Sequence, residues 1–261
     1  MTNSKMVLGL ISMILLALAP ATQDAGTGLR SPAKKEITMQ LVSAAENSSL
    51  DWKAQYGYIE YNVEHNAEEN RGYTAGIIGF TSRTHDMLEL VEYYQKIAPE
   101  NALAKFLPAL KKVDGTPSTE GLGEPFMAAW KKAGEDPKFR EAQDHERDRV
   151  YFDPAVDRAI ADGLHELGQF IYYDAAVMHG SADGIRKRAM RKAKPPAQGG
   201  DEVAYLNAFL DARKAAMKAE QGHQDTTRVD TMQRKFLKEG NLSLTPPLVF
   251  KVYGDPYNIE K

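Results

Sequence analysis

Apolar residues recur at helical spacing through most of this chain. The first such stripe begins just after Glu36 and comprises Ile37, Leu41, Val42 and Ala45. Residues spaced about three to four positions apart share one side of a helix, so this pattern predicts a helix with one buried face. We expect the helix to end near Glu46, which places the Glu46 carboxylate at its C-terminal end.

A short β region interrupts the helical pattern. Residues 61–70 are polar and show no period, whereas residues 72–80 are rich in β-branched and aromatic side chains and are broken by Gly76 and Gly79. A run of this kind predicts a loop that enters a short β-hairpin or a small sheet.

Almost everything after this region has a helical pattern. One apolar stripe covers residues 87–97, another covers 103–110, and the longest runs from Pro154 to His179, where Gly180 is suited to a helix stop. The longest stripe predicts a central buried helix that joins two lobes. Residues 242–257, which contain Pro246-Pro247, predict extended structure packed on the body of the protein.

The N-terminus has the pattern of a secretory signal peptide. Lys5 precedes an apolar run over residues 6–19, and Ala19-Pro20-Ala21 fits the small-x-small rule for cleavage before Thr22. The apolar run falls short of the ~20 residues that a membrane-spanning helix needs. We therefore expect residues 1–21 to be a signal peptide and residues 22–261 to form a single catalytic domain of two lobes with a cleft between them.

Composition excludes several classes of site. The chain has no cysteine, which excludes disulfides, thiolate metal sites and a cysteine nucleophile. It contains no HExxH pattern, EF-hand loop or phosphate-binding glycine loop, so no metal or cofactor is expected. The net charge of −3 is mild, and the basic run over residues 187–194 lacks interleaved aromatic residues, so nucleic acid is not an expected partner.

Two acidic segments supply the chemistry of a glycosidase. Such an enzyme needs one carboxyl group to protonate the departing oxygen and a second to activate water or attack the sugar ring. Glu46 lies in one segment, and Glu69 lies in a second, separate segment. Six blocks of sequence carry further information: residues 45–56 (AENSSLDWKAQY), 71–80 (RGYTAGIIGF), 146–155 (ERDRVYFDPA), 173–180 (YDAAVMHG), 196–202 (PAQGGDE) and 209–214 (FLDARK).

These blocks, in this order, resemble the chitosanases of glycoside hydrolase family 46 over nearly the whole mature chain. The resemblance implies an α+β, mostly α-helical, lysozyme-like fold of two lobes with a small β-sheet and a long central helix. It also implies inverting endo-hydrolysis of β-1,4 linkages between glucosamine units of chitosan. Its expected partners are chitosan and glucosamine oligosaccharides, and the protein is expected to be secreted, monomeric and without stable membrane association after signal cleavage.

The resemblance also implies roles for individual residues. Glu46 is implied as the general acid, Glu69 as the general base, and Thr74 as the residue that helps to hold the attacking water. Substrate contacts are implied for Tyr58, Arg71 and Asp86, although Asp86 could instead cap the helix that begins near Met87. A supporting charge network behind the general acid is implied for Asp174, Arg213 and Arg228.

One position departs from the family pattern. The family places Asp two residues before the Arg-Gly-Tyr-Thr block, whereas this chain has Glu69 there, after a longer loop. Glu68 and Glu64 therefore remain alternatives as the base. Two other functions also stay open: a lysozyme-like peptidoglycan or chitin hydrolase, and a catalytically silent amino-sugar binding protein.

Overall fold

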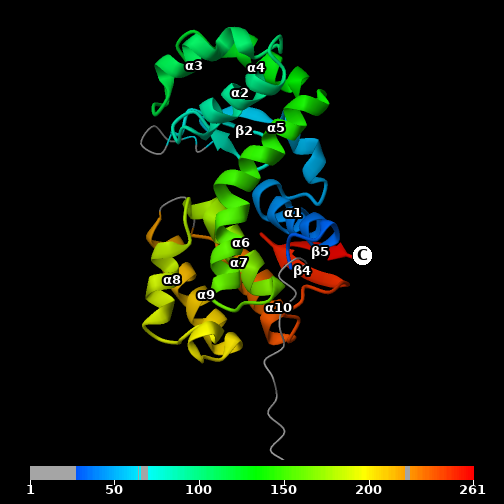
Figure 1. The fold of residues 1–261 in the computed structure, drawn as a ribbon, viewed down its shortest axis with the longest axis vertical. Helices are drawn as coiled ribbons and strands as arrows, with labels where there is room; N and C mark the ends of the chain where they lie inside the picture. The colour runs from blue at the N-terminus through cyan, green and yellow to red at the C-terminus, as the bar shows by residue number, and fades with distance from the viewer. Residues whose placement is uncertain (1–27, 64, 66–69, 221–223) are drawn as a thin grey trace, which may run out of the picture.

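A computed structural model describes residues 28–63, 65, 70–220 and 224–261 of the chain, and Figure 1 shows them as two lobes. Most of these residues are helical, and the strands form two small antiparallel sheets. The expected fold class, α+β and mostly α-helical with a small sheet, is confirmed. The candidate signal peptide, residues 1–21, lies outside the described residues.

Helix α1 (Pro32–Asn47) occupies the region where the two lobes meet (Figure 1). Its N-terminus is well defined, because the Ser31 hydroxyl accepts a hydrogen bond from the Lys34 amide and Pro32 suits the first turn. The predicted apolar stripe is buried and packs against helix α7 (Glu166–His179). Ser48 then adopts a left-handed conformation with φ 49°, which ends the helix. A short 3₁₀ helix, η1 (Trp52–Gly57), follows.

The smaller lobe contains a three-stranded sheet covered by helices. Strands β1 (Ile59–Tyr61), β2 (Tyr73–Ala75) and β3 (Phe80–Thr81) pair antiparallel in chain order, as the β-rich run predicted. The helices of this lobe are α2 (Asp86–Ile97), η2 (Ala104–Phe106), α3 (Leu107–Val113), α4 (Gly123–Ala133) and α5 (Pro137–Arg147). Edge-to-face ring contacts link its core residues Tyr73, Phe126, Trp130 and Phe139.

A long helical element connects the lobes. Helix α5 continues through a π-helical segment, η3 (Asp148–Phe152), into α6 (Asp153–Ala161), and Figure 1 shows this green element running from one lobe into the other. Pro154 has no amide proton to donate to the preceding turn. The wider π turn, in which the Asp153 amide bonds to the Asp148 carbonyl, accommodates that missing donor within a continuous helix.

The prediction of one helix from Pro154 to His179 was wrong. Helix α6 ends at Ala161, and α7 begins only at Glu166. Gly163 has φ +80°, and an added Cβ would lie 3.0 Å from the Ala197 amide nitrogen, so the chain turns there. The apolar stripe continues across the turn because both helices bury a face. The element that joins the lobes is α5–η3–α6, whereas α7 is the buried central helix of the larger lobe.

The rest of the larger lobe is helical until its C-terminal hairpin. Its remaining elements are α8 (Asp183–Met190), η4 (Pro196–Gln198), α9 (Glu202–Ala219), the π-helical segment η5 (Arg228–Gln233), α10 (Arg234–Lys238), β4 (Leu248–Val252) and β5 (Asp255–Ile259). The predicted extended segment is thus an antiparallel hairpin. It is anchored by Phe250, whose ring contacts Phe236 and Tyr257, and β4 packs on η5.

Candidate active site

Glu46 is the penultimate residue of α1, as the apolar stripe predicted. Its side chain is 31% exposed, and its Oε1 accepts a 2.5 Å hydrogen bond from Arg228 Nη2. Arg228 is the first residue of η5 and is itself only 2% exposed. The carboxylate therefore meets a buried cation on one side and stays open to solvent on another.

Asp174 lies behind this pair, in the middle of α7, and is completely buried. Its Oδ1 accepts a 2.8 Å hydrogen bond from Arg228 Nη2, and its Oδ2 accepts one of 2.6 Å from Arg213 Nη1. Arg213, on α9, also donates to the Asp174 backbone carbonyl at 3.2 Å. The structure thus brings together Glu46, Asp174, Arg213 and Arg228 from four separate elements.

The charges in this cluster favour an ionised Asp174. Burial would raise the pKa of Asp174, but the guanidiniums of Arg228 and Arg213 outweigh burial and hold that pKa below its ordinary value. Burial lowers the pKa of Arg213, although Asp174 opposes the shift. Burial also acts to lower the pKa of Arg228, but Asp174 and Glu46 outweigh it and raise that pKa. Arg228 therefore stays protonated beside Glu46.

Gln233 completes the cluster and was missed by the sequence reasoning. Its Nε2 donates to Asp174 Oδ2 at 2.7 Å, and its Oε1 accepts from Arg213 Nη1 at 3.1 Å. Gln233 ends the π-helical segment that Arg228 begins. Five residues make about one turn of such a helix, so both side chains lie on one face. α-helical periodicity places residues three or four positions apart on one face, so it does not reveal a spacing of five.

Thr74 lies at the centre of the small sheet. In the strand register it is opposite Glu60 of β1 on one side and Thr81 of β3 on the other. Its hydroxyl is buried and has no hydrogen-bond partner among the residues that the structure describes. Directly opposed residues share a face, so the Glu60 carboxylate lies on the same face as the Thr74 hydroxyl.

Glu60 is a second residue that the sequence reasoning missed. Its Oε2 accepts a 3.0 Å hydrogen bond from the hydroxyl of Tyr58, the partly buried residue that follows η1. The available signal was its polar position between Ile59 and Tyr61 in a strand. The structure therefore places a carboxylate that the sequence analysis did not name in a hydrogen bond with Tyr58 and directly opposite Thr74 in the strand register.

Asp86 is the first residue of α2 and is only 6% exposed. His85 occupies the N-cap position, so Asp86 is not the N-cap of this helix. Asp86 Oδ1 accepts hydrogen bonds from the Thr81 amide and the Thr84 hydroxyl, each at 2.8 Å, and Oδ2 accepts one of 2.8 Å from the Tyr151 hydroxyl. Burial raises the pKa of Asp86, and these hydrogen bonds oppose the shift.

Arg71 lies at the entry to β2, and its side chain is exposed. Its backbone carbonyl accepts a 3.2 Å hydrogen bond from the Arg83 amide, which fixes the chain at this point against the segment that follows β3. The candidate bases Glu69, Glu68 and Glu64 lie outside the described residues.

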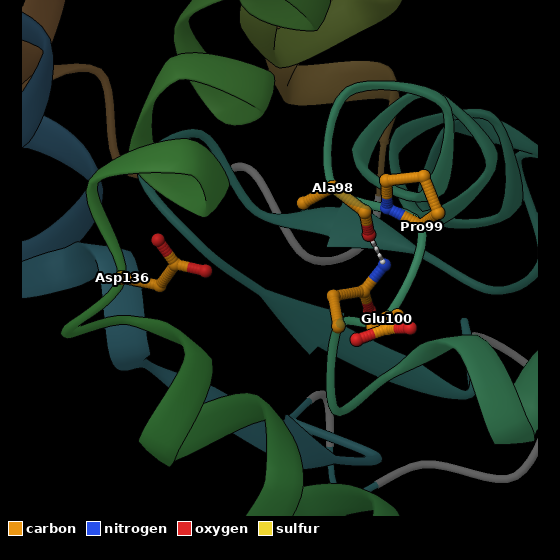
Figure 2. Close-up of a pocket in the computed structure, with 5 residues that line it drawn as sticks. Ala98, Pro99, Glu100 and Asp136 are labelled. Atoms are coloured by element: carbon orange, nitrogen blue, oxygen red, sulfur yellow. Dashed lines mark hydrogen bonds between the residues drawn. The ribbon is translucent and has the colours of Figure 1, made fainter.

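The pocket in Figure 2 lies elsewhere on the smaller lobe. Its lining residues are Ala98, Pro99, Glu100, Asn101 and Asp136. Ala98 follows the C-terminus of α2, whereas Asp86 begins that helix, and twelve residues of helix span ~18 Å. The Asp136 carboxylate already accepts hydrogen bonds from the Tyr94 hydroxyl and the Lys138 amide. This pocket therefore contains none of the candidate site residues.

Neither a cluster of metal ligands nor a membrane-spanning helix is found in the part of the chain that the structure describes. In that part, no three His, Asp or Glu side chains gather in a way that could hold a metal ion. No helix within residues 28–63, 65, 70–220 and 224–261 combines the length and apolar character needed to cross a bilayer.

Comparison with known proteins decides the family. The sequence profile of glycosyl hydrolase family 46 matches residues 40–248. The chain belongs to this family. It is 64% identical, over 247 residues, to a chitosanase of Streptomyces sp. strain N174, with 92% of this chain and 87% of the relative covered.

Solved structures of family 46 relatives agree with this assignment. A co-crystal structure of chitosanase OU01 with substrate superimposes with a TM-score of 0.85 at 53% identity, covering 89% of this chain and 99% of that one. The family 46 chitosanase of Gynuella sunshinyii in complex with chitotetraose gives a TM-score of 0.77 at 34% identity, covering 87% and 97%. The predictions of a glycoside hydrolase and of the lysozyme-like α+β fold of family 46 are confirmed.

Proposed function

We propose that this chain is a secreted endo-chitosanase that hydrolyses β-1,4 linkages between glucosamine units of chitosan with inversion at the anomeric carbon. The observation that carries the proposal is the placement of Glu46, partly exposed and held at 2.5 Å by Arg228, in a family 46 chain that is 64% identical to a chitosanase. Two similar solved structures are complexes of chitosanases, one with substrate and one with chitotetraose, which supports the same substrate class.

Glu46 is the proposed general acid. Arg228 donates to Oε1, which leaves Oε2 as the oxygen that carries a proton to the linkage oxygen. In the same step, the bond from the anomeric carbon to that oxygen breaks and a water oxygen bonds to the anomeric carbon from the opposite side. Glu69 is the proposed base that takes the proton of this water. The buried Thr74 hydroxyl, which can both donate and accept, is proposed to hold the water in place.

Substrate binding is proposed to involve Tyr58, Arg71 and Asp86. Chitosan carries ammonium groups, and carboxylates such as Asp86 are suited to pair with them. Behind the site, Asp174 holds Arg228 in position and Arg213 holds Asp174. We further propose that residues 1–21 are removed on export, before Thr22, and that the mature protein is a monomer in a single domain with its substrate cleft between the lobes.

Glu46→Gln tests the acid role. Gln keeps the shape of the side chain but has no acidic proton, so we expect kcat on soluble chitosan to fall by about 10²–10⁴-fold with little change in oligosaccharide affinity. Glu36→Gln is the matched control, because Glu36 lies in the same helix and bonds the Trp52 indole at 2.9 Å. Full activity of the Glu46→Gln variant would show that Glu46 is not the general acid.

The base is tested by Glu69→Gln, Glu68→Gln and Glu64→Gln in parallel. We expect only Glu69→Gln to lose turnover, and proton NMR of the wild-type reaction should detect the inverted anomer first. Loss of turnover in Glu68→Gln or Glu64→Gln alone would move the base to that residue. Release of the retained anomer would contradict the inverting mechanism.

A substrate panel separates the proposal from its alternatives. Reducing ends are measured after incubation with chitosan, chitin and bacterial cell wall. We expect release from chitosan. Activity on chitin or cell wall alone would indicate a lysozyme-like hydrolase instead, and binding of glucosamine oligomers without any turnover would indicate a silent sugar-binding protein.

A further inference from the structure

The turn of the C-terminal hairpin holds a tyrosine in a backbone conformation that suits other residues better. Val252 of β4 pairs with Asp255 of β5, so Tyr253 and Gly254 form a two-residue turn, with φ of 54° and 92°. Turns with positive φ at both positions favour Asn, Asp or Gly at the first. A bulky residue with positive φ is uncommon, and residues held in such conformations cluster at functional sites.

Hydrogen bonds attach this turn to the segment that holds Glu46. The Tyr253 amide donates to the Thr227 hydroxyl at 2.9 Å, and Thr227 directly precedes Arg228, the residue that bonds to Glu46. A second bond of 2.6 Å runs from the Thr231 hydroxyl to the Lys251 carbonyl. The hairpin turn is therefore fixed in position relative to the candidate general acid.

The Tyr253 side chain is open to solvent, on the turn that bonds to the residue preceding Arg228. It is 45% exposed, one of four large apolar or aromatic side chains with this degree of exposure among the described residues. Burial raises the pKa of its hydroxyl, while the charge of Arg228 lowers it and the charge of Glu46 raises it. The backbone contact with Thr227 places this partly exposed ring near the Glu46–Arg228 pair.

We propose that Tyr253 is a substrate-positioning residue, whose exposed ring stacks on a glucosamine unit beside the scissile linkage. The ring face can make two favourable interactions with this ligand. The pyranose presents an apolar face of C–H groups for stacking, and its ammonium is attracted by the electron-rich ring. The inference rests on the proposed function, since it requires a glucosamine polymer at Glu46. It explains why a tyrosine occupies a turn position at which Asn would carry less strain.

Tyr253→Asn is the discriminating variant. Asn suits positive φ, so the hairpin should keep or gain thermal stability while the ring is lost. Calorimetric titration with glucosamine hexamer, in a Glu46→Gln background that prevents turnover, should show affinity weakened by about 3–10-fold. Tyr253→Phe keeps the ring and should bind within about 2-fold of the parent. Val249→Asn removes another exposed residue of the same hairpin and should leave affinity unchanged.

The outcomes separate the two hypotheses. If the Glu46→Gln parent binds the hexamer and Tyr253→Asn binds it equally well, the stacking role is wrong while the proposed function stands. If Tyr253→Asn weakens binding and Val249→Asn does so by the same factor, the effect belongs to the hairpin rather than to the ring, and the proposal is again overturned. If the parent binds neither the hexamer nor soluble chitosan, the proposed function fails and the role of Tyr253 fails with it.

Discussion

Asp174→Asn is the substitution that most directly tests the buried network behind Glu46. Asp174 accepts three side-chain hydrogen bonds, one from Arg228 and two from Arg213 and Gln233. Asn keeps the volume but has one oxygen and one NH₂ group. In one orientation of the Asn side chain the NH₂ group faces the donor of Arg228, and in the other it faces the donors of Arg213 and Gln233. Either orientation therefore sets donors against each other. The charge between the two buried guanidiniums is lost as well.

The magnitude follows from complete burial. Asp174 and Arg213 are fully buried and Arg228 is 2% exposed, so water cannot replace the lost carboxylate. Removing one member of a buried ion pair costs about 3–5 kcal/mol, because the other charge is left buried without a partner. For a chain of this size, each kcal/mol lowers Tm by about 2–4 °C. We therefore expect Asp174→Asn to lower Tm by roughly 6–20 °C.

Urea unfolding and differential scanning calorimetry measure this loss. Asp211→Asn is the control, because Asp211 also pairs with an arginine, Arg234, at 2.8 Å, but its side chain is 56% exposed. The control should change the free energy of unfolding by no more than about 0.5 kcal/mol. A loss below about 1 kcal/mol in Asp174→Asn would refute the reasoning, since it would mean that the buried charges relax or that water enters.

Wild type and Asp174→Asn should also differ in the pH dependence of their stability. The pKa of Asp174 is lowered in the folded state, so its contribution to stability is fully present above the unfolded-state pKa of about 3.9 and is lost as pH falls through the folded-state pKa. The stability difference between wild type and Asp174→Asn should therefore shrink as pH falls below about 4. A difference that stays constant down to the acid transition would contradict this assignment.

Three further substitutions, one of them a control, test packing and the connection between the lobes. Gly134→Ala would place a Cβ 2.5 Å from the Gly57 Cα, so we expect a loss of about 1–3 kcal/mol in urea unfolding. Gly184→Ala, in open space on α8, should be neutral or stabilising by up to about 1 kcal/mol, and equal effects of the two would refute the steric argument. Tyr151→Phe removes the donor to Asp86 Oδ2 and should cost about 1–3 kcal/mol, whereas an unchanged urea midpoint would show that water replaces the hydroxyl.

Local patterns predicted the elements better than their continuity. The stripe after Glu36 and the β-rich run after Gly72 both lie where expected, because each reflects one buried face and its own period. The stripe from Pro154 to His179, in contrast, crosses Gly163 without a change of period, so periodicity joined α6 to α7. Only the packing of Gly163 against the segment at Ala197 shows why the chain turns there.

The sequence by itself determined the family, the mostly helical fold and the position of Glu46 at a helix end, since these depend on short-range pattern and on blocks of matching residues. The tertiary structure decided which groups surround Glu46. Gln233 contacts Asp174 from far along the chain, and Tyr253 reaches the site through a hydrogen bond to Thr227. Contacts of this kind join distant segments through burial and hydrogen bonding, and no local period records them.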